Sequence, residues 1–142
     1  MLHVPIASDH AGFELKQYLI KAFSAEIAFD DLGTHSDAPV DYPDFAHNEA
    51  NLIHNNTYSK GILICGSGNG VAMTANKHGN VRAALCWNAE IARMARLHND
   101  ANILVLPSRF IDFDIAKQCV KAFFSTEFEG GRHACRVKKI SY

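Results

Sequence analysis

The chain contains 142 residues, of which 48% are hydrophobic and 20% are charged, and its formal net charge is −1. This length predicts a single domain, residues 1–142, with a full hydrophobic core. The near-neutral charge argues against nucleic acid or a membrane surface as a partner. No apolar run approaches ~18 residues and no signal-peptide pattern is present, so no membrane span or leader is expected. The four cysteines form no C-x-x-C pair, which indicates reduced thiols in a cytoplasmic protein.

The first half of the chain predicts two strands and two helices. Residues 2–7 are expected to form a strand, although Pro5 removes one donor from the ladder. A turn at residues 8–12 precedes a helix, which is predicted by apolar side chains at a period of 3.6 from Leu15 to Phe23. Residues 26–31 are expected to form a second short strand. A polar loop then leads to a helix that runs to about residue 55, with Pro43 in its first turn.

The second half of the chain repeats the alternation of strand and helix. The apolar run at residues 62–64 is typical of a strand buried on both faces, and a helix over residues 71–77 follows it. Further strands are predicted at residues 81–86 and 102–106, and further helices at residues 88–100 and 112–124. The tail that follows carries a Gly-Gly-Arg-His sequence. Five strands alternating with helices predict an α/β sandwich with a parallel sheet.

The turn between residues 65 and 70 is the most informative stretch of the sequence. Glycines at positions 66, 68 and 70 let backbone amides approach an anion closely, and a helix begins just behind them. The spacing matches neither a Walker loop nor the dinucleotide fingerprint. A thiol precedes the turn. Cys65 is either a general base or nucleophile near neutral pH, or a small apolar residue that ends a strand, and its local sequence leaves both interpretations open.

Right-handed crossovers bring all strand-to-helix turns to one edge of such a sheet. The turns expected there contain Asp9-His10, Cys65 to Gly70, Trp87-Asn88 and Ser108-Arg109. Each residue also has an ordinary explanation, such as a helix cap for Asp9 or a solvated surface cation for Arg109. The His and Cys residues show no metal-ligand spacing, so no metal site is expected.

Several motifs together resemble the B-type ribose-5-phosphate isomerases and their wider family, which includes galactose-6-phosphate and allose-phosphate isomerases. The likeness covers nearly the whole chain. It rests on residues 7–12, 41–43, 61–70, 75–77, 97–100, 108–109 and 129–136. The resemblance implies a Rossmann-like three-layer sandwich with a five-stranded parallel sheet. It also implies isomerisation through an enediolate in the pentose phosphate pathway, without a cofactor or metal.

The resemblance also implies roles for individual residues. Cys65 is the implied base that moves a proton between C2 and C1, and His98 helps to open the furanose ring. Ser67 and the amides of Gly66, Gly68, Asn69 and Gly70 hold the enediolate oxygen. The other implied substrate-binding residues are Asp9, Tyr42 and Asn99 for the sugar hydroxyls, and His10, Arg109, Arg132 and Arg136 for the phosphate. Pro5 and Asn69 depart from the pattern expected of the family.

A homodimer or tetramer with active sites shared between chains is implied as well. Crossover handedness places the loop at His98 on the sheet edge opposite Cys65 of the same chain. We therefore expect Cys65 to work with His98, Arg132 and Arg136 of a partner, and a C-terminal arm over about residues 126–142 to contact that partner. The alternative functions are the same isomerisation of a six-carbon sugar phosphate, a nucleotide- or flavin-binding module, and a sugar-phosphate sensor without catalysis.

Overall fold

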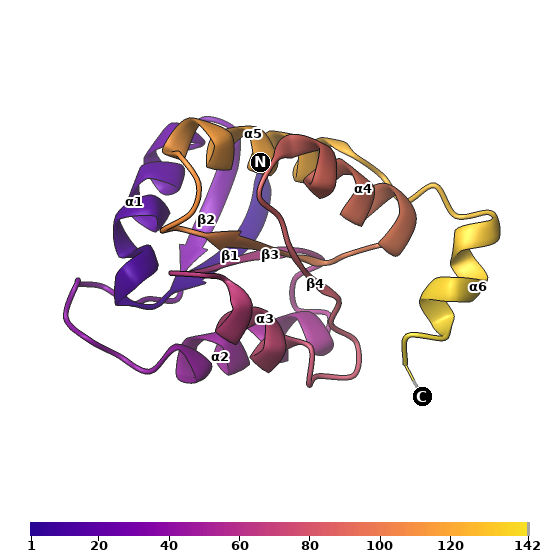
Figure 1. Ribbon diagram of the computed structural model, residues 1–142, viewed down its shortest axis with the longest axis horizontal. Helices are drawn as coiled ribbons and strands as arrows, with labels where there is room; N and C mark the ends of the chain where they lie inside the picture. Colours follow the sequence, from indigo (N-terminus) through magenta and orange to yellow (C-terminus); the bar gives the residue numbers. More distant parts are fainter. Residues whose placement is uncertain (142) are drawn as a thin grey trace.

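In the computed structural model, which describes residues 1–141, five parallel strands form one sheet in the order β2-β1-β3-β5-β4. The sheet lies between two layers of helices, with α1, α4 and α5 on one face and α2 and α3 on the other (Figure 1). The predicted α/β sandwich is therefore confirmed. The strands are β1 (Leu2–Ser8), β2 (Ile27–Asp31), β3 (Gly61–Cys65), β4 (Ala83–Leu85) and β5 (Ile103–Pro107). The helices are α1 (Phe13–Ala22), α2 (Tyr42–His54), α3 (Asn69–Ala75), α4 (Ala89–Asn99), α5 (Phe113–Ser125) and α6 (Arg132–Lys138).

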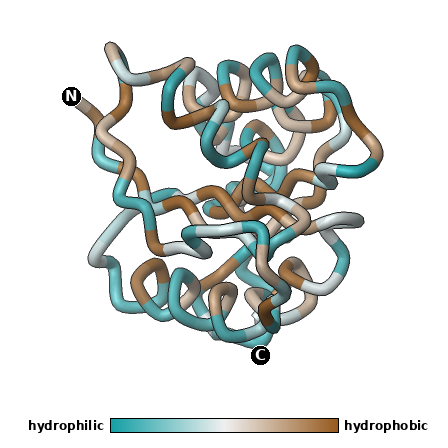
Figure 2. The backbone as a smooth tube through the Cα atoms, turned by 90° about the vertical axis from the view of Figure 1, so that its left-hand side faces the viewer, coloured by the Kyte–Doolittle hydropathy of each residue, from teal (hydrophilic) through white to brown (hydrophobic). Residues whose placement is uncertain are grey.

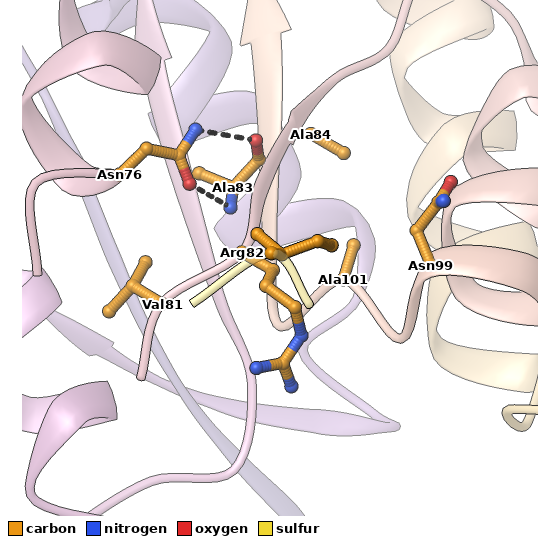
Figure 3. A pocket seen from close by; sticks show the side chains of 8 residues that line it. Asn76, Val81, Arg82, Ala83, Ala84, Asn99 and Ala101 are labelled. Atoms are coloured by element: carbon orange, nitrogen blue, oxygen red, sulfur yellow. Dashed lines mark hydrogen bonds between the residues drawn. The ribbon is translucent and has the colours of Figure 1, made fainter. Parts of the chain in front are cut away.

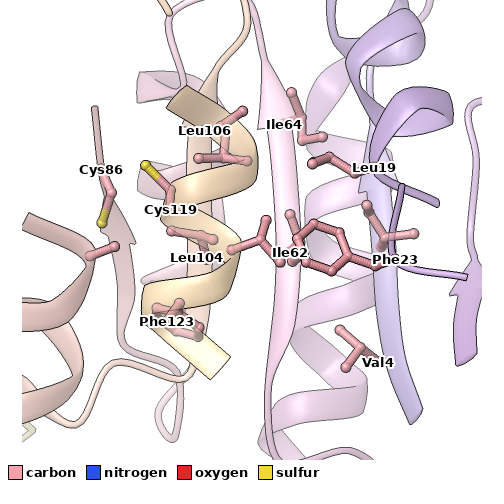
Figure 4. Packing of buried hydrophobic residues seen from close by; sticks show 14 of the residues in the cluster. Val4, Leu19, Phe23, Ile62, Ile64, Cys86, Leu104, Leu106, Cys119 and Phe123 are labelled. Carbon is pink, nitrogen blue, oxygen red and sulfur yellow. The ribbon is translucent and has the colours of Figure 1, made fainter. Parts of the chain in front are cut away.

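Alternation along the strands divides the core into two parts. Ile62 and Ile64 of β3 face α1 and α5 and pack with residues such as Leu19 and Phe123 (Figure 4). Leu63, between them, joins the cluster beneath α2 and α3 on the opposite face. Hydrophobic residues therefore gather in the middle layer of the molecule, with hydrophilic residues along the outer helices (Figure 2). No helix within residues 1–141 is long and apolar enough to cross a membrane.

Pro5 is tolerated in β1 because of its place in the ladders. The carbonyl of Ile6 accepts a hydrogen bond from Leu32 N at 2.9 Å, so Ile6 directs its backbone groups towards β2. The backbone groups of Pro5, one residue earlier, therefore point to the opposite side, towards β3. Pairing with β3 begins only at Ile6, opposite Ile62. The missing N–H of Pro5 therefore lies just outside that ladder.

The structure differs most from the sequence prediction at two places, and α3 also covers residues 69–75 rather than 71–77. β4 covers only residues 83–85 rather than 81–86, and the Asn76 side chain binds both the amide and the carbonyl of Ala83 on this edge strand. The tail after α5 contains the helix α6, which the sequence analysis missed. Only one residue of α6, His133, is buried, so the helix shows no apolar period in the sequence. α6 stands beyond α4, apart from the sheet (Figure 1).

Glu49 is a buried acid on α2 whose carboxyl group has no hydrogen-bond partner in the described part of the chain. Its side chain is fully buried, and neither carboxyl oxygen has a hydrogen-bond partner within residues 1–141. Gly61 makes room for it, because a Cβ there would lie 2.6 Å from Glu49 Oε2. Burial raises the pKa of Glu49 well above its usual value. The folded chain therefore holds this proton more tightly than the unfolded chain does.

This difference predicts that the stability of Glu49→Met relative to the wild type will increase as the pH rises above the unfolded pKa of the acid. With a raised folded pKa, the stabilising protonation is complete below the unfolded pKa and is lost as the pH rises towards the folded value. The free energy of unfolding of the wild type should fall by up to about 1.4 kcal/mol per pH unit in this window. Urea denaturation at several pH values between 5 and 8 should show the gap between variant and wild type widening with pH. An exposed acid, replaced as Glu26→Gln, serves as the control, and parallel curves for Glu49→Met and wild type would contradict the prediction.

Candidate active site

The candidate site is built on the carboxyl end of β3 and on the hydrogen bonds that join this end to the residues following β5. Cys65 is the last residue of β3 and is 5% exposed. Its carbonyl accepts hydrogen bonds from the backbone N of Ser108 at 3.0 Å and from the Ser108 hydroxyl at 3.3 Å. The carbonyl of Gly66 accepts another from Arg109 N at 3.0 Å. The ends of two neighbouring strands are thereby tied together, which fixes where the thiol sits.

Two of the turn glycines are required by close packing. Gly68 has φ +78°, and a Cβ there would meet Leu85 Cδ1 at 2.4 Å. At Gly70 a Cβ would lie 2.4 Å from the ring of Tyr42, so the start of α2 is packed directly on the turn. The Ser67 hydroxyl accepts a hydrogen bond from Asn69 N at 3.2 Å. The turn is therefore held in one conformation, with the Ser67 side chain exposed to solvent.

A cavity of about 590 Å³ opens beside this turn and collects side chains from four segments of the chain. It lies beyond the carboxyl ends of β1, β3 and β5, next to the place where the strand order reverses direction between β1 and β3, and ligands bind at such a point in parallel sheets. Eight of the predicted site residues line it: Asp9, His10, Tyr42, Cys65, Gly66, Ser67, Gly70 and Arg109. The sequence analysis missed Ala11 and Phe110, which also line the cavity. Their only signal is that each adjoins a predicted residue.

The polar side chains of the cavity are held by local contacts. The Asp9 carboxylate caps the turn after β1, where it accepts a hydrogen bond from Gly12 N at 3.1 Å. The His10 Nδ1 atom accepts one from Val40 N at 3.1 Å, so in the neutral ring the proton resides on Nε2. The Arg109 guanidinium lies over Gly66, where a Cβ would come within 3.1 Å of Nη1. A thiol, a carboxylate, an imidazole and a guanidinium therefore face one cavity.

The cysteines differ in their surroundings. Burial raises the pKa of Cys86 to about 12 and that of Cys119 to about 11, so neither is a thiolate near neutral pH. Cys65 is also buried, but it alone among the cysteines lines this cavity. All four are free thiols in the described part of the chain.

The remaining predicted residues lie outside the cavity. Gly68 is buried beneath the turn, and Asn69 faces a neighbouring hollow along α3. Asn99, at the end of α4, lines a different cavity beside Asn76, Arg82 and Ala83 (Figure 3). Arg132 and Arg136 are exposed on α6.

His98 also lies at the end of α4, where it is surrounded by residues that follow α5. Its ring stacks on that of His133, with centroids 4.3 Å apart and planes inclined by 17°. Its Nε2 atom is 3.9 Å from Glu129 Oε2. The pKa of His133 is lowered from its usual value. Burial is the main cause, and the neighbouring His98 is the second. The sequence analysis gave no role to Glu129 or His133, although both belong to motifs that it noted.

The comparisons with known proteins agree over almost the entire chain. The family model described as Ribose/Galactose Isomerase matches residues 4–140. A probable ribose-5-phosphate isomerase B of Mycoplasma pneumoniae is 47% identical over 95% of this chain and 90% of its own length. Ribose-5-phosphate isomerase B of Escherichia coli is 36% identical over 99% of this chain and 95% of its own.

The chain is also similar to solved structures of ribose-5-phosphate isomerases. A ribose 5-phosphate isomerase of Thermotoga maritima has a TM-score of 0.96 and 46% identity, covering 99% of this chain and 97% of that one. The ribose-5-phosphate isomerase B of Mycoplasma genitalium, solved with bound ribulose-5-phosphate, has a TM-score of 0.93 and 42% identity. The match to it covers 98% of this chain and 93% of that one.

Proposed function

The chain belongs to the ribose/galactose isomerase family, and on this premise we propose that it interconverts ribose 5-phosphate and ribulose 5-phosphate through an enediolate. The resemblance indicated by the sequence motifs is confirmed, and the chain is a sugar-phosphate aldose–ketose isomerase. One observation of the structure supports the mechanism most directly. The Cys65 thiol lies in a cavity beside the amides of a rigid glycine turn.

This arrangement provides the two elements that an enediolate requires. In the ring-opened sugar, the Cys65 thiolate takes the proton from C2 and returns it to C1, while the hydroxyl proton moves from O2 to O1. The negative charge that develops on oxygen needs donors fixed in advance. The amides of Gly66, Ser67 and Gly70, which line the cavity, and the Ser67 hydroxyl are such donors, whereas Asn69 N already donates to Ser67 Oγ. A positioned base contributes typically ~10²–10⁴-fold and one such donor ~10²–10³-fold.

The cavity of a single chain is incomplete for a phosphorylated furanose. It contains one guanidinium, that of Arg109, together with His10, whereas His98, Asn99, Arg132 and Arg136 gather at the far end of α4 and on α6. We place the phosphate between His10 and Arg109 of one chain and Arg132 and Arg136 of another, because Arg forks suit a phosphate dianion. Asp9, Tyr42 and the partner's Asn99 then bind the sugar hydroxyls, and the partner's His98 opens the ring.

A homodimer with two-fold symmetry accommodates this arrangement, since each chain offers the same surfaces to the other. Segment 126–141 would be the arm that reaches the partner, and its helix α6 packs against α4 rather than on the sheet. The free thiols agree with a reducing compartment, and we place the reaction in the cytoplasmic pentose phosphate pathway.

The substrate preference is tested with a coupled assay that compares ribose 5-phosphate with allose 6-phosphate and galactose 6-phosphate. We expect the highest kcat/KM with the pentose phosphate, because several relatives of this chain, including those of Mycoplasma pneumoniae and Escherichia coli, are named for that substrate. A higher kcat/KM with either hexose phosphate would assign the chain to the other branch of the same family. Binding without turnover of all three would indicate a sensor.

Dialysis against a chelator is expected to leave the isomerase activity undiminished. The proposed proton transfer uses a thiol and the proposed charge stabilisation uses amides, so no step depends on a Lewis acid. Activity measured before and after dialysis, with the same protein held in chelator-free buffer as control, checks this. A loss of activity that zinc or magnesium restores would show that the side-chain mechanism is wrong.

A further inference from the structure

Outside the cavity, the junction of α4 and α6 brings together three side chains that can bind metals. One donor atom each from His98, Glu129 and His133 lies within 4.8 Å of the other two. The backbone fixes this grouping, because Glu129 N donates a hydrogen bond to the Leu97 carbonyl at 3.0 Å and His133 N donates to that of Gly130 at 3.0 Å. The grouping is therefore part of the fold and joins a segment that follows α5 to the end of α4.

His133 gives a second and independent indication of a ligand. The residue is 7% exposed, and its Nε2 atom is buried without a hydrogen-bond partner among residues 1–141. Buried polar atoms in native structures nearly always have a partner, and those that lack one require an explanation such as an ion or a water molecule. A metal ion bound by this imidazole together with its two neighbours would provide that partner.

We propose that His98, Glu129 and His133 form a binding site for a divalent transition metal ion of the Zn²⁺ class, and that its occupation inhibits the isomerase. Two imidazoles and a carboxylate are a common ligand set for Zn²⁺, with a fourth position left for water. Mg²⁺ and Ca²⁺ prefer all-oxygen ligands and are not expected here.

The geometry requires only local adjustment. Ligand atoms ~2.0–2.1 Å from a tetrahedral Zn²⁺ lie about 3.3 Å from one another. His98 Nε2 and Glu129 Oε2 are already 3.9 Å apart, and no pair of donor atoms in the cluster is more than 4.8 Å apart. The side chains of His98 and Glu129 are 36% and 54% exposed and have room to rotate, whereas His133 is the fixed point. Rotation of His98 would separate the two stacked rings and direct both towards one ion.

The inhibition follows from the identity of one ligand. His98 is the residue proposed to open the sugar ring by transferring a proton. An imidazole bound to a metal ion has given its only nitrogen lone pair to the metal, so it can no longer accept a proton. This part of the inference rests on the proposed function, whereas binding of the metal does not. Calorimetry and the visible spectrum of bound Co²⁺ measure the site in the absence of any turnover.

The test titrates chelator-treated full-length protein with Zn²⁺ by calorimetry and with Co²⁺ by visible absorption. We expect one ion per chain and the visible bands of four-coordinate Co²⁺ in the wild type. Glu129→Gln and His133→Asn should each weaken binding by more than about tenfold, because even outer-shell changes cost 10–100-fold in affinity. Glu129 is exposed, so Glu129→Gln should fold even if His133→Asn does not.

A matched control comes from the other histidine pair of the molecule. His47 Nδ1 and His78 Nε2 lie 2.8 Å apart between α2 and the loop after α3, so His47→Asn removes a competing metal ligand without touching the proposed site. It should leave both the stoichiometry and the affinity unchanged. Absence of binding in the wild type, or binding that both site variants retain, would refute the site, as would binding that disappears with His47→Asn.

The activity assay then tests the inhibitory part. Zn²⁺ should slow ribose 5-phosphate isomerisation in the wild type, EDTA should restore it, and Glu129→Gln should require more than about tenfold higher Zn²⁺ for the same fractional loss. Inhibition that is equally strong in Glu129→Gln would place the inhibitory metal elsewhere, for example on the Cys65 thiol. A protein that binds Co²⁺ as expected but has no isomerase activity would refute the proposed function and leave the metal site standing.

Discussion

Replacing Cys65 with alanine is expected to remove almost all isomerase turnover and to leave KM nearly unchanged. A general base acts in the transition state, so its loss lowers kcat by ~10²–10⁴-fold without removing contacts that bind the substrate. Cys65 lines the cavity but is itself only 5% exposed, so the alanine variant loses little contact area with a bound sugar phosphate. Steady-state kinetics of the purified variant with ribose 5-phosphate measure both parameters.

Two controls separate the loss of a base from damage to the fold. Cys65→Ser keeps the shape of the side chain apart from the smaller oxygen atom, yet a neutral hydroxyl is a far weaker base than a thiolate, so this variant should be almost as inactive as Cys65→Ala. Cys135→Ala removes the exposed thiol on α6 and should retain activity. More than about a tenth of wild-type kcat in Cys65→Ala would be too much for a lost base, and would move that role to another group of the cavity.

Chemical modification adds an independent readout of the same thiol. Iodoacetamide should inactivate the wild type, with ribose 5-phosphate slowing the reaction, and should inactivate Cys135→Ala at the same rate. Cys86 and Cys119 should not interfere, because burial raises the pKa of their thiols to about 12 and about 11. Loss of activity that the substrate does not slow would place the reactive thiol outside the site.

The parts of this molecule that the sequence predicted are those governed by local patterns. β3 is recognisable because a strand with helices on both faces must be apolar at every position, and all five of its residues are buried. The cavity edge is predictable because right-handed crossovers send every strand-to-helix turn to one side. Asp9, Cys65 and Arg109 therefore meet in the cavity, as their positions at or just after the carboxyl ends of β1, β3 and β5 require.

Other features depend on contacts between distant segments and leave no such pattern. α6 has a single buried residue, so its sequence lacks the apolar period that marks a helix. The stacking of His98 on His133 depends on the path that the chain takes after α5 to return to the end of α4. Glu49 resembles any other polar residue of α2 in the sequence, and only the packing against Gly61 reveals that it is buried without a partner.

A mixture of two inactive variants, Cys65→Ala and His98→Ala, is expected to regain activity when the chains exchange partners. The two residues lie at opposite ends of β5. His98 comes shortly before Ile103, whereas Cys65 is paired with Pro107 at the other end. A strand of five residues spans roughly 17 Å at ~3.3 Å per residue, too far for His98 to act on a sugar held at its own Cys65.

If the site is shared, a mixed dimer contains one site with both lesions and one site with neither. Equal amounts that exchange at random give mixed dimers for half of the molecules, so the mixture should regain about a quarter of wild-type activity. The assay compares each variant alone with the mixture after exchange, which is followed by mass spectrometry of differently tagged chains.

The matched control mixes Cys65→Ala with Arg109→Ala. Both of these residues line the same cavity of one chain, so every site in a mixed dimer carries exactly one lesion and no activity should return beyond that of the parents. Verified exchange of Cys65→Ala with His98→Ala without recovery would mean that His98 serves its own chain or takes no part in catalysis. Recovery in both mixtures would instead show that Arg109 acts across the interface. Recovery only in the first mixture supports the pairing of Cys65 with the partner's His98, because that pairing alone leaves one intact site in each mixed dimer.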